Sequence, residues 1–74
     1  MTSEWAILFP GRYSSVQHPV YPRAHPHGWV GCTAADLTDA WCLAETHFLG
    51  YWRLVVPLAE ISIEDYPLGE IGRV

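Results

Sequence analysis

Histidine and cysteine side chains are the residues of this chain whose types could bind a metal ion. His25 and His27 flank a proline, and Cys32 follows five residues after His27. In an extended backbone, residues 25 and 27 point to the same side, and imidazole and thiolate groups are zinc ligands. The spacing matches no common zinc module, and the chain has no Cys-x-x-Cys pair. We therefore expect no metal and no cofactor, and keep a zinc domain built on His25, His27 and Cys32 as a first alternative.

Cys32 is also the strongest candidate for a nucleophile. It precedes the expected helix, whose N-terminal dipole lowers the pKa of a nearby thiol, and histidines lie five and seven residues before it. A small residue that fills a tight junction beside Gly31 would look the same. A chain of 74 residues also has little room for a pocket, an oxyanion site and an orienting group. We predict no enzymatic activity, and keep a thiol-dependent enzyme using Cys32 as a second alternative.

Aromatic, cationic and imidazole side chains are concentrated between residues 12 and 29. Such side chains dominate binding hot spots, because they bring large rigid surfaces or a planar guanidinium at modest entropic cost. We predict that this segment contacts a protein partner. The expected contact residues are Arg12, Tyr13, Tyr21, Arg23, His25, His27 and Trp29. Stacking on single-stranded RNA is less favoured, because two arginines on a negatively charged chain attract RNA weakly.

The formal charge of the chain is −4 at pH 7, and it is unevenly distributed. Residues 1–32 carry two arginines and one glutamate, whereas residues 33–74 carry seven acidic residues against two arginines. This balance disfavours nonspecific binding to nucleic acid. Carboxylates can imitate DNA phosphates, but the acidic residues of the second half are spread out as on an ordinary solvated face.

One long helix is expected over residues 33–49. Thr33 and Asp36 fit a variant of the capping box at its start, and Gly50 is the residue type that ends a helix at low cost. Apolar residues recur between these ends at spacings of three and four, which places them on one stripe. The residues of this stripe are Leu37, Ala40, Trp41, Ala44 and Phe48.

Short strands are expected on both sides of this helix. Residues 4–9 and 28–32 are rich in strand-forming types, and 59–65 alternate between apolar and polar. Residues 51–58 have the strongest pattern, so we place them at the centre of the sheet. A strand over residues 13–18 would be an edge strand, because its hydrophobic pattern is poor.

Two segments lack such patterns. Residues 19–28 contain three prolines and a glycine, which predicts a loop. Residues 66–74 are expected to be a partly anchored C-terminal tail.

These elements predict an α+β fold, in which a small, mostly antiparallel sheet of three to five short strands packs on the helix over residues 33–49. The chain has the length of one domain, residues 1–74, and half of its residues are hydrophobic. The expected core residues are Trp5, Ile7, Phe9, Leu37, Trp41, Ala44, Phe48, Trp52, Leu54 and Val56.

We expect a non-enzymatic protein-interaction domain, of the small accessory or inhibitor type that phages and mobile elements encode. It would bind a larger protein through the segment 12–29, or form a homodimer on a sheet edge. No membrane contact is expected, since the apolar run 5–9 is too short for a signal sequence or a membrane span. The expected location is the cytoplasm, with Cys32 and Cys42 as free thiols.

Overall fold

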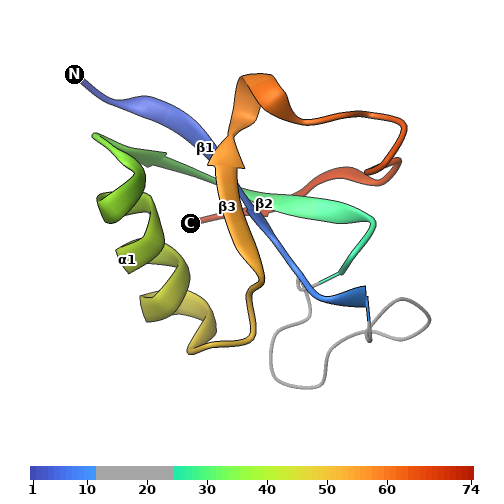
Figure 1. Ribbon diagram of the computed structural model, residues 1–74, viewed down its shortest axis with the longest axis horizontal. Coiled ribbons are helices and arrows are strands. Elements are labelled where there is room, and N and C mark those ends of the chain that lie inside the picture. The colour runs from blue at the N-terminus through green and yellow to red at the C-terminus, as the bar shows by residue number, and fades with distance from the viewer. Residues whose placement is uncertain (12–24) are drawn as a thin grey trace.

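Strand β1 (Ser3–Leu8) lies inside a four-stranded sheet in the computed structural model, which describes residues 1–11 and 25–74. The strand order is β3-β1-β2-β4. Strand β1 pairs in antiparallel fashion with both of its neighbours, and β4 pairs in parallel with β2. The single α-helix of the described residues covers one face of this sheet (Figure 1). The remaining elements are β2 (Gly28–Ala34), α1 (Leu37–Phe48), β3 (Leu54–Pro57), the short 3₁₀ helix η2 (Leu58–Glu60) and β4 (Gly69–Arg73). The predicted α+β class is confirmed.

The predictions for β1 and β2 are confirmed within a few residues, and β2 continues two residues beyond its expected end. At the end of β1 and just beyond it, the four consecutive residues from Ala6 to Phe9 are at most 3% exposed, so both faces of the strand are covered there. Ile7 pairs with Val30 of β2 and with Val55 of β3. These three apolar residues bring the middle strands together beneath the helix.

The start of the helix differs from the prediction. Asp36 caps α1, and its Oδ1 accepts a hydrogen bond from the Asp39 backbone N–H at 2.9 Å. Thr33 is still in β2, where it pairs with Glu4. Both residues are good cap formers in isolation. The pairing of β2 with β1 continues through Ala34, which keeps Thr33 extended and leaves Asp36 as the cap.

Helix α1 packs on the sheet through its small residues. Ala40 and Ala44 are fully buried, and Phe48 is 4% exposed. The rings of Phe48 and Phe9 meet edge to face, with centroids 4.9 Å apart. The helix then ends at Leu49, whose backbone adopts the left-handed conformation with φ of 42°. This arrangement confirms Ile7, Phe9, Ala44 and Phe48 as core residues.

Strand β3 is an edge strand, which corrects its predicted central position. Its apolar alternation is also shifted by one residue from the prediction. Val55 is buried at 4% exposure, whereas Leu54 is 38% exposed. A continuous apolar run such as Leu54 to Val56 does not indicate which of its residues faces the core. Pairing with Ile7 of β1 decides this.

The two last predicted segments also differ from the structure. Residues 59–65, expected as a strand, contain the end of η2 and a turn. Residues 66–74, expected as a partly anchored tail, contain β4 instead. The backbone N–H of Leu68 donates to the His27 carbonyl, and that of Val74 donates to the Gly31 carbonyl. The predicted strand over 13–18 lies outside the described residues, as does most of the predicted loop over 19–28.

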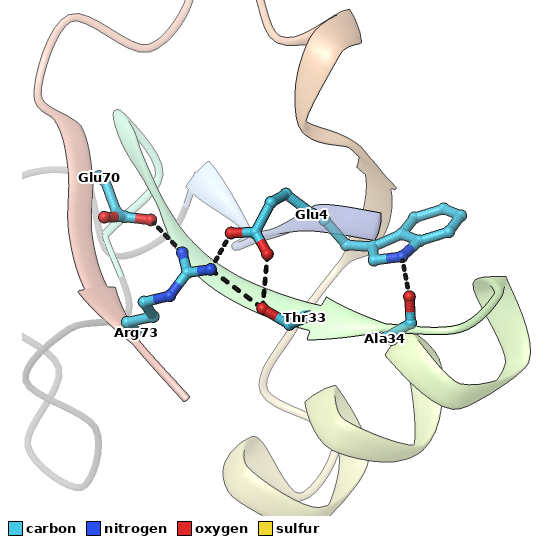
Figure 2. A network of polar contacts seen from close by, with 6 residues as sticks. Glu4, Thr33, Ala34, Glu70 and Arg73 are labelled. Atoms are coloured by element: carbon cyan, nitrogen blue, oxygen red, sulfur yellow. Dashed lines mark hydrogen bonds and ion pairs between the residues drawn. The ribbon is translucent and has the colours of Figure 1, made fainter. Parts of the chain in front are cut away.

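Polar side chains tie β4 to the other strands (Figure 2). The Arg73 guanidinium lies between two carboxylates: it forms an ion pair with Glu4 of β1, and another with Glu70 at 2.9 Å. Thr33 donates its hydroxyl to Glu4 and accepts from Arg73 Nη2 at 3.1 Å. These groups are exposed, so each contact contributes at most about 1 kcal/mol. Together they fix the last strand across three segments that are distant in the sequence.

Replacing Phe48 by alanine should lower the free energy of unfolding by about 3–5 kcal/mol, because it removes the ring that packs against Phe9 and leaves a cavity. The matched control is Leu37→Ala, which changes a side chain that is 44% exposed and should cost less than about 1 kcal/mol. Thermal melts followed by circular dichroism check both, with Phe48→Leu as an intermediate variant. Equal melting temperatures for Phe48→Ala and Leu37→Ala would contradict the position of the core.

Replacing Gly28 by alanine should destabilise the pairing of β2 with β4. A Cβ at this position would lie 2.7 Å from Ile71 Cγ2 and 3.0 Å from the Gly69 carbonyl oxygen. We expect a loss of about 1–3 kcal/mol from this overpacking. Gly11→Ala is the control, because a Cβ at Gly11 would meet no atom within 4 Å. Urea denaturation of the two variants compares them, and no difference between them would contradict this close approach.

Candidate protein-binding groove

Three of the predicted contact residues, His25, His27 and Trp29, lie in the part of the chain that the structure describes. The backbone N–H of His27 donates to His25 Nδ1 at 3.1 Å, and the two imidazole rings have centroids 5.4 Å apart. The hydrogen bond thus occupies a nitrogen that a metal would need. The other four predicted contact residues, Arg12, Tyr13, Tyr21 and Arg23, lie outside the described residues, so their role stays a prediction.

Trp29 is partly buried and packs against the segment before β4. Its ring meets Tyr66 nearly at right angles, with centroids 6.5 Å apart, and the Tyr66 hydroxyl accepts from Arg53 Nη2 at 3.2 Å. The Trp29 indole N–H is buried and has no hydrogen-bond partner among residues 1–11 and 25–74. These contacts hold the start of β2 beside the turn that leads into β4.

Cys32 lies in the core beneath α1, where it is fully buried. It is in β2, four residues before the helix cap, and burial raises the pKa of its thiol. This is the opposite of the shift expected for a thiol activated by a helix dipole. The stretch from His27 to Cys32 spans about 16 Å of extended chain, too far for ligands of one metal ion. Among the described residues, no three His, Cys, Asp or Glu side chains converge as a metal site would require.

An exposed apolar groove runs along the outer side of α1. Trp41 is 48% exposed and Leu37 is 44% exposed. Trp52, which precedes β3, closes the groove, and its ring meets that of Trp41 edge to face with centroids 5.4 Å apart. The volume of the groove is about 610 Å³. Its walls are formed by Leu37, Thr38, Trp41, Cys42, Glu45 and Trp52.

The groove lies at the edge of the sheet formed by β3, beside the outer part of the apolar stripe of α1. Ala40, Ala44 and Phe48 cover β2, β1 and β3, which uses one part of the stripe. Leu37 and Trp41 lie at the border of the same stripe, toward the sheet edge formed by β3. Strand β3 is only four residues long, and no further strand of the described residues lies beyond it. The border of the stripe therefore faces solvent.

Hydrogen bonding fixes the orientation of the groove wall. The Trp52 indole N–H donates to Glu45 Oε2 at 2.8 Å, which joins the end of α1 to the chain entering β3. This bond orients the Trp52 ring against Trp41. Glu45 also supplies the one charged side chain that lines the groove. The site is thus a rigid aromatic surface with a carboxylate at one end.

The sequence analysis assigned Leu37, Trp41 and Trp52 to the core. Trp52 is partly buried and packs against the core, whereas Leu37 and Trp41 are exposed. The prediction that Leu37 and Trp41 lie on the apolar stripe of the helix is correct. A helical spacing shows which side of a helix is apolar, but it contains no information on the width of the sheet. One available signal was the abundance of large apolar side chains in a chain this short, which exceeds what one helix on one sheet can cover.

Comparisons with protein-family models, curated protein sequences and solved structures find no match to this chain. No helix within residues 1–11 and 25–74 has the length and apolar character needed to cross a membrane. The geometry of the groove is therefore the basis for assigning a function.

The two cysteines should differ strongly in reactivity. Both are free thiols, as predicted, but Cys42 is exposed in the groove and Cys32 is buried. We expect iodoacetamide to modify Cys42 at the rate of a free thiol and Cys32 at least about 100-fold more slowly, because Cys32 must wait for local opening. Mass spectrometry of timed samples gives the two rates, and in urea both should react alike. Rapid modification of native Cys32 would contradict this expectation and would favour the hypothesis of a thiol-dependent enzyme.

Proposed function

We propose that this chain is a non-enzymatic protein-interaction domain that binds another protein in the groove between α1 and Trp52. The observation that carries this proposal is the exposed Trp41 ring, held against the partly buried Trp52. A tryptophan that leaves half of its side chain in water forgoes the burial that stabilises small domains. Tryptophan is also the residue type most enriched in the hot spots of protein interfaces.

The rigidity of the pair supports this role. The hydrogen bond from Trp52 to Glu45 and the edge-to-face contact with Trp41 hold both rings before any partner arrives. Binding then loses little side-chain entropy, which leaves more of the contact energy for affinity. Rings that were exposed only for lack of space in the core would not need to be held in one orientation.

A different protein is favoured over a second copy of this chain. Two copies would each bring a net charge of −4 and the acidic helix α1 to the interface. Like charges brought together oppose association. We retain the expectation of a small accessory or inhibitor protein acting in the cytoplasm, with the segment 12–29 as a further contact region.

Cross-linking from Cys42 tests this proposal. A benzophenone attached to Cys42 places a photoreactive group on the groove wall, and buried Cys32 remains unmodified. Irradiation in an extract of the protein's own cells should give one discrete adduct with a different protein. Excess unlabelled chain should compete the adduct away, and excess Trp41→Ala chain should compete at least about 10-fold less well, as expected for loss of a hot-spot residue.

The matched control carries the label on the opposite side of the sheet, in a Cys42→Ser, Ser62→Cys variant. Ser62 is exposed in the turn after η2, which lies on the other side of β3 from α1 (Figure 1). This variant should give no such adduct. Equal competition by the native chain and the Trp41→Ala chain would overturn the assignment of the groove. An adduct of twice the chain mass would replace the proposal by a homodimer.

A further inference from the structure

One carboxylate, that of Glu45, lines the groove, and Arg53, which follows Trp52, donates to the Tyr66 hydroxyl. Between residues 25 and 52 the chain carries Asp36, Asp39 and Glu45 but no lysine or arginine. All three acidic residues belong to α1 or its cap. Glu45 is the one of them that lines the groove, whereas Asp39 lies on another face of the helix; together they give α1 a negative charge that attracts a cationic partner.

Glu45 has a position that the fold itself does not favour. It lies in the last turn of α1, where the helix dipole is negative and a carboxylate is destabilising. Its Oε2 accepts from Trp52, whereas its Oε1 makes no hydrogen bond or ion pair within the described residues. This oxygen is available to a cationic group that enters the groove.

The length and polarity of the groove fit a helix. Leu37, Trp41 and Glu45 follow one another at spacings of four residues, which spans about 12 Å, or two helical turns. An amphipathic helix laid along α1 can place apolar side chains at i and i+4 over Leu37 and Trp41. A lysine or arginine one turn further then reaches Glu45.

We propose that the partner segment is an amphipathic α-helix with apolar anchors flanked by lysine or arginine. This inference rests on the proposed function and names the class of ligand. The apolar anchors fill the space between Leu37, Trp41 and Trp52. The cationic side chain binds Glu45 Oε1 and replaces part of the solvent around the acidic helix.

Titration with synthetic peptides tests this inference. The first probe is a 14-residue helical peptide with leucine at i, i+4, i+7 and i+11 and lysine at the flanking positions. In a second probe glutamate replaces lysine, and in a third serine replaces leucine. The indole N–H signals of the four tryptophans, recorded by two-dimensional ¹⁵N–¹H NMR, report the site of binding. The leucine–lysine peptide should shift the signals of Trp41 and Trp52 and leave those of Trp5 and Trp29 unchanged.

Two charge variants separate the roles of position and net charge. Glu45→Gln keeps an oxygen acceptor for the Trp52 indole but removes the charge from the groove. Glu64→Gln removes the same charge from an exposed turn on the other side of β3. We expect binding of the leucine–lysine peptide to weaken about 3-fold or more in Glu45→Gln and to stay unchanged in Glu64→Gln. Added salt should weaken binding to the native chain more than binding to Glu45→Gln.

The outcomes distinguish this inference from the function on which it rests. Equal binding of the lysine and glutamate peptides, or equal losses in the two charge variants, would overturn the cationic character of the partner. Absence of shifts at Trp41 and Trp52 with every peptide would overturn the helical ligand. Either result leaves the Cys42 cross-link as the separate test of whether any protein occupies the groove.

Discussion

The burial of β1 on both faces is the constraint on which the rest of this structure depends. Four successive residues from Ala6 to Phe9 are almost completely buried, so the strand cannot be an edge and cannot have a solvated side. It is flanked by β2 and β3, covered by α1 and contacted by η2. Covering β1 in this way takes most of the helices and strands that this chain of 74 residues forms. The fold is thus built around one short apolar strand.

Helix α1 covers β1 by packing close to the sheet. This close packing determines which apolar side chains remain exposed. Ala40 and Ala44 have small side chains, so α1 lies near the sheet and covers its middle strands. Large residues on the border of the helical stripe then have no sheet beneath them, because β3 ends the sheet on that side. Trp41 therefore contacts Trp52, which is itself only partly buried against the core. The groove therefore lies where the apolar stripe of α1 reaches the edge of the sheet at β3.

The parts of the fold that depend on local pattern could be predicted from the sequence. The existence of α1 and the positions of β1 and β2 follow from spacing, residue type and turn signals. The helix start could not be predicted locally, because the choice between Thr33 and Asp36 depends on how far β2 pairs with β1. Strand β4 was missed, because its sequence has little alternation and its parallel pairing joins residues about 40 positions apart.

Only the type of side chain in the candidate site could be predicted from the sequence, and not its position. Aromatic side chains suited to binding were recognised as a class, but the pair that forms the groove was assigned to the core. Of the segment predicted to bind, the described residues His25 and Trp29 are engaged in local hydrogen bonding and packing. Exposure is set by the width of the sheet, which arises from pairing between distant segments. A sequence pattern can show that an apolar residue needs a partner, but not whether that partner is in the same chain.

Glu45 has a role in the fold that can be distinguished from its proposed role in binding. Folding needs an acceptor for the Trp52 indole N–H, and a neutral amide at position 45 could supply it without an unfavourable interaction with the helix dipole. The charge strengthens this hydrogen bond, because an ionised acceptor binds a donor more strongly than a neutral amide does. The proposed cationic ligand would give the same charge a second role, at Glu45 Oε1. The same logic applies to Trp41, because a smaller residue would close the core equally well and would expose less apolar surface.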